Sequence, residues 1–198
     1  MDKAELRRAV IARRDAIDLN ARAAKSAAVC TRLVELLERA DPAAPRTVAV
    51  YAAMGSEVDP TAFAAAAADR GWQVAYPCML SAADATTCDQ RMCMRAVAAG
   101  DVDTAPFIAR PTRTFAATDI DSDRFPIAAA EALDMIVVPL VAFDRTGARL
   151  GYGGGCYDRY LSTVSASCQI VGIAFDEQRV EHVPADAHDL PLPNIISA

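Results

Sequence analysis

The sequence predicts an α/β fold: a single-domain three-layer sandwich with a mostly parallel sheet and helices on both faces. A chain of 198 residues with 53% apolar content can bury one substantial core, so we expect one domain covering residues 1–198. A strand-like run at Thr47–Tyr51 precedes a helical run at 61–70 and a second strand-like run at 73–76. This strand–helix–strand order is the unit of a parallel α/β sheet.

One amphipathic helix is expected at the N-terminus, up to about Ile17. Asp2 is a suitable N-cap, and Glu5 stands three residues later, which is a weak form of the capping box. Lys3 and Arg7 lie four positions apart and therefore share one face of this helix. By themselves, two such residues are more typical of a solvated basic face than of a ligand site.

A second helix is expected at about 20–39, where an apolar stripe ends at Asp41-Pro42 and Pro45. The run at Thr47–Tyr51 is apolar almost throughout, which is typical of a central strand covered on both faces. Asp59-Pro60 then starts the helix at 61–70, and Gly71 ends it.

The second half of the chain contains three further expected strands, at 135–138, 169–175 and, as a short edge strand, 194–197. Residues 91–97 form a weaker candidate strand. The stretch 99–126 contains several proline and aspartate residues, and we place it on the surface as a loop that could cover the active site.

The stretch Leu150–Tyr160 holds four of the nine glycines of the chain. Glycines at this density allow positive φ and let backbone N–H groups approach an anion, most often phosphate. Asp158 stands where a short helix could begin, and a carboxylate beside phosphate suits a Mg²⁺-bound nucleotide. The glycines match neither the P-loop nor the Rossmann pattern. A glycine-rich surface turn is therefore an equally good interpretation of the pattern alone.

Ligands of open α/β sheets bind beyond the carboxyl ends of the strands, and this rule brings three loops together. The first, 52–59, carries Glu57; the second, 139–158, carries the glycines and Asp158; the tail after Phe175 carries Asp189. Asp158 and Asp189 could share one Mg²⁺. A buried N-cap for Asp158 and a solvated tail residue for Asp189 are the alternatives.

Charge and cysteine usage exclude several classes of protein. The net charge of −6 and pI near 4.9 argue against a nucleic-acid-binding surface. No apolar run has the length of a membrane span, and the charged N-terminal segment does not have the pattern of a signal peptide. The six cysteines form no C-x-x-C pair, so reduced thiols are expected and zinc is not. We expect a soluble, cytoplasmic, monomeric protein whose partner is a small molecule.

Several motifs occur in the order in which one family carries them: Lys3-x-x-x-Arg7, Tyr51 with Glu57-Val58, Val137-Val138-Pro139-x-Val141-Ala142-Phe143-Asp144, Gly151-Tyr152-Gly153-Gly154-Gly155-Cys156-Tyr157-Asp158-Arg159, Gly172-x-Ala174-x-x-x-Gln178 and Pro184-x-x-x-His188-Asp189. Through these motifs the chain resembles the 5-formyltetrahydrofolate cyclo-ligase family, also called 5,10-methenyltetrahydrofolate synthetase. The resemblance spans nearly the whole chain. It is strongest at 134–189 and poor at 78–126.

The resemblance implies an enzyme that converts 5-formyltetrahydrofolate to 5,10-methenyltetrahydrofolate through a phosphorylated formyl group, splitting ATP to ADP and phosphate with Mg²⁺. By resemblance, the residues that bind ATP are Lys3, Arg7, Arg149, Leu150, Gly151, Tyr152, Gly153, Gly154, Gly155, Cys156 and Tyr157. Those that bind the folate are Ala52, Glu57, Tyr152, Gly153, Gly154, Gly155 and Cys156. Asp158 and Asp189 hold Mg²⁺, and Arg149 and Asp158 are the catalytic residues. Arg159 is a further candidate for transition-state charge.

The chain departs from the family pattern at several positions. Cys156 replaces the usual tyrosine, Gly154 stands where some relatives carry a basic residue, and Pro193 replaces an aspartate. A Glu-Pro pair expected shortly before the strand at 135–138 is not evident. Two alternatives therefore stay open: a folate- or nucleotide-binding protein with little turnover, and a related ATP-dependent enzyme acting on another N-acyl substrate.

Overall fold

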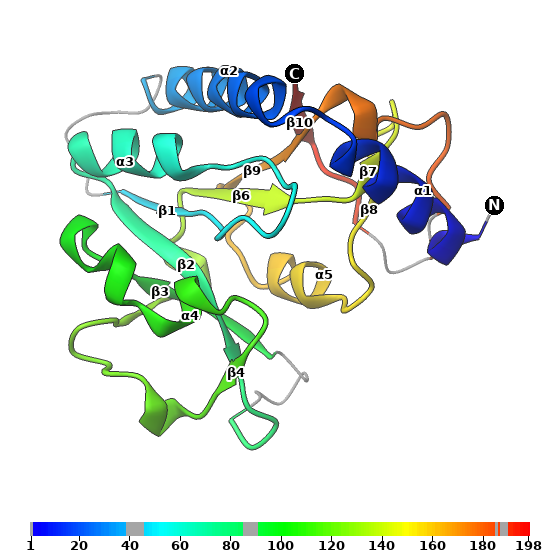
Figure 1. Cartoon of the computed structure of the whole chain (residues 1–198). Helices are drawn as coiled ribbons and strands as arrows, with labels where there is room; N and C mark the ends of the chain where they lie inside the picture. The colour runs from blue at the N-terminus through cyan, green and yellow to red at the C-terminus, as the bar shows by residue number, and fades with distance from the viewer. Residues whose placement is uncertain (1, 39–45, 85–90, 185, 187–189) are drawn as a thin grey trace.

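The computed structural model describes residues 2–38, 46–84, 91–184, 186 and 190–198. Within these residues the chain forms an eight-stranded sheet flanked by helices, with a separate two-stranded hairpin beside it (Figure 1).

The large sheet has the spatial order β10-β9-β6-β1-β2-β3-β5, with β4 paired to β2 off this path. The bounds of its strands are β1 Thr47–Ala49, β2 Gln73–Leu80, β3 Met92–Ala96, β4 Thr114–Phe115, β5 Ile127–Ala128, β6 Met135–Pro139, β9 Gln169–Ala174 and β10 Asn194–Ser197. β3 runs antiparallel to β2 and β5, and the other pairings are parallel. The expected mostly parallel sheet, with the first strand at its centre, is confirmed.

The chain changes direction across the sheet between β1 and β6. These two strands are parallel neighbours. After β1 the chain continues to β2, on one side of this strand pair, and after β6 it continues to β9, on the opposite side. The loops that follow them diverge and leave a crevice at the carboxyl edge, which is where open α/β sheets bind ligands. The loop carrying Glu57 follows β1, and the glycine stretch follows β6.

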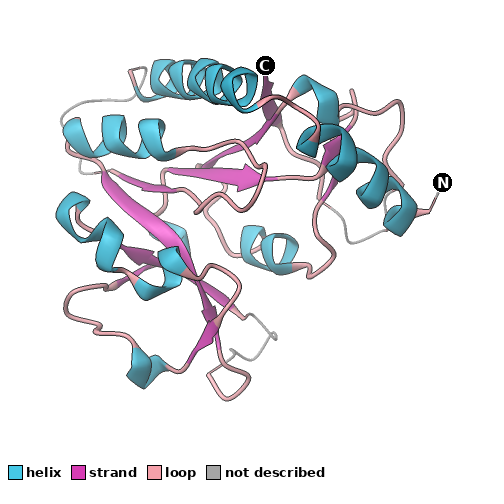
Figure 2. Cartoon of the chain, viewed as in Figure 1, coloured by secondary structure: helices cyan, strands magenta, loops and turns pink. Residues whose placement is uncertain are grey.

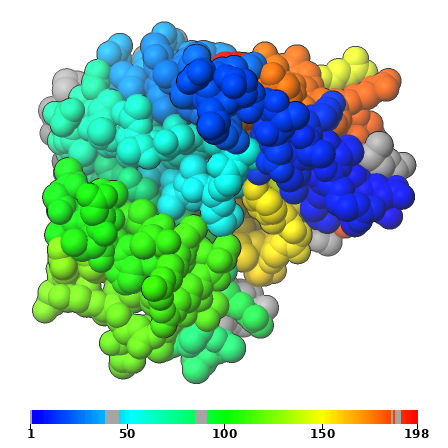
Figure 3. Space-filling view, viewed as in Figure 1, coloured from blue at the N-terminus to red at the C-terminus, as the bar shows by residue number. Residues whose placement is uncertain are grey.

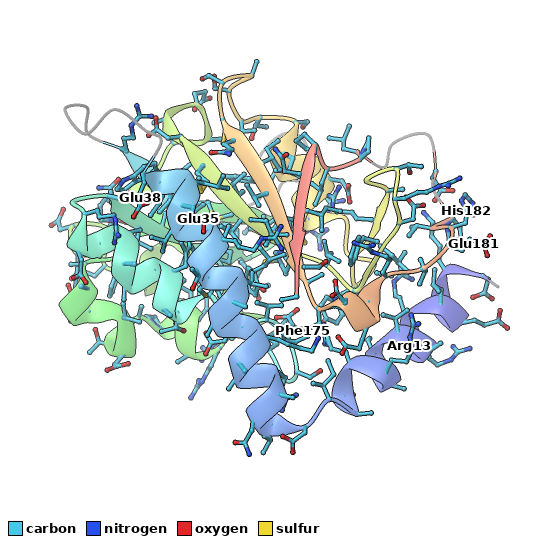
Figure 4. All side chains as sticks on the ribbon, turned by 90° about the horizontal axis from the view of Figure 1, so that it is seen from above. Arg13, Glu35, Glu38, Phe175, Glu181 and His182 are labelled. Carbon is cyan, nitrogen blue, oxygen red and sulfur yellow. The ribbon has the colours of Figure 1, made fainter. Side chains whose placement is uncertain are left out.

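Alternate residues of the central strands pack into two cores, one on each face. Val48 of β1 and Val137 of β6 lie in the core under α2 (Leu19–Leu37) and α3 (Thr61–Asp69). Ala49 and Ile136 lie in the core under α5 (Cys156–Leu161). Figure 2 shows the helices on opposite faces, and Figure 4 shows α2 lying across the sheet from above. The predicted three layers therefore follow from the two-residue period of the strands.

The N-terminal helix α1 (Lys3–Asp15) packs on the hairpin and not on the large sheet. The expected capping box is present, because the Asp2 carboxylate accepts from the Glu5 N–H at 2.7 Å and the Glu5 carboxylate accepts from the Asp2 N–H at 3.0 Å. Leu6 and Val10 pack with residues of the hairpin formed by β7 (Ala142–Phe143) and β8 (Arg149–Leu150). This contact places the polar face of α1 beside the glycine stretch.

The prediction that residues 99–126 form a surface loop is wrong in part. The segment contains several short elements: η1 Ala99–Thr104, α4 Pro106–Ala109, β4 and η2 Ala117–Asp119. Phe107, Phe115 and Phe125 are buried in the core below α2 and α3, and the rings of Phe107 and Phe125 meet edge to face with centroids 5.5 Å apart. Short elements carry too few residues to show a hydrophobic period, so the sequence pattern did not reveal this packing.

The other expected elements are confirmed with small shifts in their ends. β2 extends four residues beyond the predicted strand at 73–76, and β3 fulfils the weaker prediction at 91–97. The second helix ends at Leu37 with Glu38 as its C-cap; the expected breakers Asp41-Pro42 and Pro45 lie outside the described residues. Two further short helices complete the fold: η3 Ala130–Ala132 and η4 Asp176–Gln178.

The buried side chain of Gln178 ties the ends of β9 and β6 together. Its Oε1 accepts from the Phe175 N–H at 2.8 Å, and its Nε2 donates to the carbonyls of Leu140 at 2.6 Å and Val141 at 3.1 Å. Gln178 is 1% exposed, so water cannot replace these bonds. The side chain thereby fixes the start of the segment that leads into the hairpin and the glycine stretch.

We predict that Gln178→Leu lowers the free energy of unfolding by about 2–5 kcal/mol, because it leaves one buried N–H and two carbonyls without partners. Urea unfolding followed by circular dichroism measures this loss. The matched control is Glu181→Gln at an exposed position three residues away, which should change stability by less than about 0.5 kcal/mol. Equal stability of the two variants would show that the Gln178 bonds are not structural.

Candidate functional site

A cavity of about 720 Å³ lies at the carboxyl edge of β1 and β6. Its walls come from α1, the loop after β1, strands β2 and β3, the glycine stretch and α5. On the surface, α1, the loop after β1 and α5 meet on one face of the molecule (Figure 3). The cavity brings together the predicted site residues Lys3, Arg7, Ala52, Glu57, Arg149, Leu150, Gly151, Tyr152, Gly153, Gly154, Gly155, Cys156, Tyr157 and Asp158. The remaining one, Asp189, lies outside the described residues.

The backbone of the glycine stretch favours glycine at two positions, and an arginine side chain lies close to each of them. Gly153 and Gly155 have φ of +100° and +62°, in the region that side chains disfavour. A Cβ on Gly153 would lie 3.3 Å from the Arg7 guanidinium, and a Cβ on Gly155 would lie 2.9 Å from that of Arg159. The loop is thus shaped to let two guanidinium groups approach its backbone.

Arg7 makes a direct bond to the glycine stretch. Its Nε donates to the Gly151 carbonyl at 2.7 Å, although the two residues are 144 positions apart. Arg159 donates to the Gly154 carbonyl at 2.8 Å. Lys3, one turn before Arg7, pairs with Asp186 at 2.7 Å, and both residues line the cavity. Two basic residues of α1, Lys3 and Arg7, are therefore part of the cavity wall.

Arg149 and Asp158 form an ion pair on the cavity wall. The Arg149 Nη2 lies 2.6 Å from the Asp158 carboxylate, and its Nη1 donates to the Leu190 carbonyl. The side chain of Arg149 is 5% exposed and that of Asp158 is 28% exposed. Asp158 is not the N-cap of α5, because Gly155 holds that position and Asp158 lies in the first turn. Its carboxylate faces the cavity and is available to a ligand.

The described residues contain no cluster of three or more His, Cys, Asp or Glu side chains that could bind a metal. Mg²⁺ does not require such a cluster, since it is commonly held by one or two carboxylates, waters and phosphate oxygens. Asp158, beside the glycine stretch, fits that arrangement. The donor set on the wall is therefore suited to a metal that arrives with a phosphate ligand.

Glu57 contributes a buried carboxylate with one unused oxygen. Its Oε2 accepts from the Met54 N–H at 2.8 Å, and its Oε1 is buried with no hydrogen-bond partner among the residues that the structure describes. Burial raises the pKa of Glu57, while the Met54 N–H, the Tyr152 hydroxyl and the Arg14 charge act in the opposite direction. A buried carboxylate oxygen without a partner is costly unless a ligand supplies a donor.

Arg14, which the sequence analysis did not select, connects α1 to this carboxylate. It is buried; its Nε donates to the Ser56 hydroxyl at 2.8 Å and its Nη2 to the Tyr152 hydroxyl at 2.9 Å. Ser56 in turn donates to Asp15. Arg14 stands seven residues after Arg7 and so lies on the same helix face, and this spacing could have identified it.

A second cavity of about 610 Å³ lies on the other side of the loop after β1. Its walls include Arg22 and Cys30 of α2, Tyr76 of β2 and Ile108 of α4. Both cavities are lined by Tyr51, Ala52 and Glu57. The loop after β1 therefore separates two spaces, and the buried carboxylate borders each of them.

The main cavity also has an apolar wall that sequence reasoning missed. It is formed by Met54, Pro77, Met79, Met92, Pro111, Thr112 and Pro139. Pro77 and Met79 alternate along β2, so the period of a strand could have predicted that they share one face. Pro111 and Thr112 come from the segment 99–126, which therefore reaches the cavity as expected. Cys156 lies half-buried at the cavity, with its sulfur 3.8 Å from the Gly154 carbonyl.

In the part of the chain that the structure describes, no helix is both long and apolar enough to span a bilayer.

Comparison with solved structures identifies the fold. A 5,10-methenyltetrahydrofolate synthetase from Mycoplasma pneumoniae superposes with a TM-score of 0.72 at 23% identity, covering 99% of this chain and 98% of that one. The synthetase of Aquifex aeolicus gives 0.66 at 25% identity, covering 100% of this chain and 90% of that one. Both structures therefore have the same overall fold as this chain.

Comparison with sequences identifies the family. A 5-formyltetrahydrofolate cyclo-ligase of Escherichia coli K12 is 48% identical over 66 residues, which are 33% of this chain and 36% of that protein. One from Mycolicibacterium smegmatis is 39% identical over 64 residues, 32% of this chain and 33% of that protein. These alignments span about a third of the length of the curated relatives. The sequence model of the 5-formyltetrahydrofolate cyclo-ligase family, in contrast, matches residues 1–198, so the chain belongs to that family.

Proposed function

We propose that the protein catalyses the ATP- and Mg²⁺-dependent cyclisation of 5-formyltetrahydrofolate to 5,10-methenyltetrahydrofolate, with release of ADP and phosphate. The observation that carries the proposal is that two features lie at the same edge of the sheet. One is the glycine stretch with the basic side chains around it, and the other is the buried Glu57 carboxylate, one oxygen of which accepts no hydrogen bond from the described residues. The cradle suits the phosphates of a nucleotide, and the carboxylate suits the N–H donors of a pterin ring.

In the proposed reaction, the formyl oxygen attacks the γ-phosphorus of ATP and ADP leaves. N10 of the folate then attacks the activated formyl carbon, phosphate leaves with that oxygen, and N10 gives up its proton as the methenyl bridge forms. Phosphoryl transfer asks a protein mainly to position the reactants and neutralise charge.

The cations around the glycine stretch are assigned to the phosphates of ATP. Lys3 and Arg7 come from α1 and Arg149 from β8, so the charge reaches the cradle from two sides. The backbone N–H groups of residues 150–157 supply further donors. Asp158, with Asp189, would hold the Mg²⁺ that neutralises phosphate charge during transfer. Arg149 could then pair with either of two anions, Asp158 or a phosphate oxygen. Paired with the phosphate oxygen, it would stabilise the negative charge that develops during phosphoryl transfer.

The folate is assigned to the space that borders Glu57. The free Oε1 accepts from pterin N–H groups, and the small side chain of Ala52 leaves room for the ring beside it. Both cavities touch these two residues, so a folate can extend into the second cavity while its formyl group faces the phosphates. In this arrangement ATP and the folate occupy different parts of the site, and only the formyl group and the γ-phosphate come together.

The alternative of a binding protein with little turnover rests on Gly154 and Cys156. The cation that a basic residue at 154 would bring is supplied by Arg159, whose guanidinium donates to the Gly154 carbonyl at 2.8 Å. Cys156 replaces an aromatic contact worth about 0.5–1.5 kcal/mol, which changes affinity more than chemistry. These residues of the main cavity wall therefore support catalysis of the reaction and not only binding of the ligands.

The proposed activity is tested by the near-UV absorbance of the methenyl product. We expect absorbance to rise only when 5-formyltetrahydrofolate, ATP and Mg²⁺ are all present, with one ADP formed per product. Omission of each component in turn is the control. Tight folate binding without product would support the binding-protein alternative, and ATP splitting driven only by another N-acyl compound would support a different substrate.

We predict that Arg7→Ala weakens ATP binding by about 1.5–3 kcal/mol, or roughly 10- to 150-fold, because a charged donor to phosphate is lost. Titration calorimetry with ATP and with 5-formyltetrahydrofolate separates the two ligands, and folate affinity should stay within about threefold of wild type. The matched control is Arg8→Ala, the exposed neighbour on the same helix. Unchanged ATP affinity in Arg7→Ala would reduce α1 to a structural role.

We predict that Glu57→Gln weakens folate binding at least about tenfold, while the amide oxygen can still accept from the Met54 N–H. The ionised carboxylate is the better acceptor, so wild-type folate affinity should rise with pH through the Glu57 pKa, which burial raises above the ordinary carboxyl value. Of the groups that face Glu57, the Arg14 charge lowers the pKa of Glu57, and Tyr51, Tyr152 and Tyr157 have pKa values raised by burial.

The pH profile of folate affinity in Glu57→Gln should therefore be flat where the wild-type profile rises. ATP affinity, measured in the same variant, is the internal control and should not change. An identical rise in both proteins would assign the titration to another group and remove Glu57 from the folate site.

A further inference from the structure

Two thiols face each other across strands β2 and β3, outside both cavities. Cys78 and Cys93 are direct partners in the antiparallel register. The Leu80 N–H donates to the Arg91 carbonyl at 2.8 Å two positions further along, so Cys78 and Cys93 form a hydrogen-bonded pair. The Cα atoms of such a pair lie about 5.5 Å apart, within the span of a disulfide. Cys78 is fully buried and Cys93 is half-buried, with its sulfur 3.8 Å from the Cys78 carbonyl.

A buried arginine lies beside these thiols. Arg95 stands two residues after Cys93 on β3, so the two side chains share a face of the strand. It is 2% exposed; its Nη1 donates to the Phe125 carbonyl at 2.7 Å, and within the described part of the chain its Nε is buried without a hydrogen-bond partner. Among the described residues no carboxylate pairs with it, although a guanidinium remains charged in proteins. An uncompensated buried charge is strongly destabilising, so a counter-ion is expected nearby.

We propose that Arg95 holds Cys93 as a thiolate and that Cys78 and Cys93 form an oxidisable dithiol, which hydrogen peroxide converts to a cross-strand disulfide. The contact with the Cys78 thiol lowers the pKa of Cys93, and the charge of Arg95 acts in the same direction. The pKa of Cys78 is raised by that contact and by burial. Cys93 is also the more exposed of the two thiols, whereas Cys78 is fully buried, so Cys93 is the attacking sulfur and Cys78 the resolving one. The assignment is independent of the proposed folate chemistry.

The oxidation balances in two steps. The Cys93 thiolate attacks one peroxide oxygen, the O–O bond breaks, and hydroxide leaves and takes a proton to become water. The sulfur of Cys78 then attacks the Cys93 sulfenic acid, the S–O bond breaks, and a second water carries away the thiol proton. The two thiols lose two electrons to the peroxide, and a dithiol reductant reverses the reaction.

The other described cysteines serve as internal comparisons. The pKa of the Cys30 thiol and that of the Cys168 thiol are raised by burial, so little thiolate forms at either position. Cys156 lies at the main cavity and has no cysteine beside it in the described structure. None of the three has both an adjacent thiol and a buried guanidinium.

The test is brief treatment of the full-length chain with hydrogen peroxide, followed by alkylation and peptide mapping without reduction. Cleavage before aspartate separates the cysteines, because Asp84 stands between Cys78 and Cys88, and Asp89 between Cys88 and Cys93. We expect two thiols per chain to disappear together, a linked peptide pair containing Cys78 and Cys93, and full recovery of both thiols with dithiothreitol.

Two single substitutions distinguish the attacking cysteine from the resolving one. In Cys78→Ser, Cys93 should accumulate as a sulfenic acid that dimedone labels; in Cys93→Ser, Cys78 should stay reduced. Cys30→Ser is the matched control and should oxidise like wild type. Arg95→Met should slow oxidation of Cys93 at least tenfold if it folds, as judged by circular dichroism. The cysteine variants decide the proposal whether or not Arg95→Met folds.

Three outcomes would overturn the proposal. One is oxidation of Cys93 no faster than that of Cys30 or Cys168. The second is a disulfide that pairs Cys93 with Cys88, which lies outside the described residues. The third is a Cys78→Ser chain in which Cys93 gives no sulfenic acid under conditions that form the wild-type disulfide.

Discussion

The arrangement of the whole site depends on how α1 is held against the rest of the molecule. Arg14 is buried at the end of this helix and donates to Ser56 on the loop after β1 and to Tyr152 in the glycine stretch. One guanidinium thus fixes three segments that are distant in the sequence. Because helices are stiff, fixing the last turn of α1 also fixes Arg7, two turns earlier, over Gly153. The basic cradle is therefore a product of helix docking and not of the glycine stretch alone.

The sequence predicted most of what depends on local chemistry. The Asp2–Glu5 capping box, the continuous apolar run of the first strand and the glycines after β6 are each visible in a short window, and each is confirmed. The prediction that Glu57 and the glycine stretch share one sheet edge also held, because strand order in a parallel sheet brings successive carboxyl ends together.

The features that the sequence did not reveal depend on contacts between distant segments. The second cavity is lined by the loop after β1 and by α2, α3, β2, η1 and α4, and no local period marks residues that line a space between several elements. The aromatic residues of 99–126 join the core through short elements without periodicity. The pairing of Cys78 with Cys93 depends on the register of a hairpin whose turn cannot be derived from composition. In each case the feature depends on tertiary contacts between distant segments, which a short window of sequence does not show.

Charge explains why a protein with net charge −6 can bind a polyanion in the proposed way. Each cation of the cradle already has a partner: Lys3 has Asp186, Arg149 has Asp158, and Arg7 and Arg159 have loop carbonyls. Arrival of a nucleotide with Mg²⁺ would therefore exchange partners. In the proposed reaction, Asp158 would exchange Arg149 for the metal, and Arg149 would exchange Asp158 for a phosphate oxygen. Such an exchange would give Asp158 and Arg149 new partners of opposite charge, so the wall can stay ordered when empty and still release cations to the phosphates.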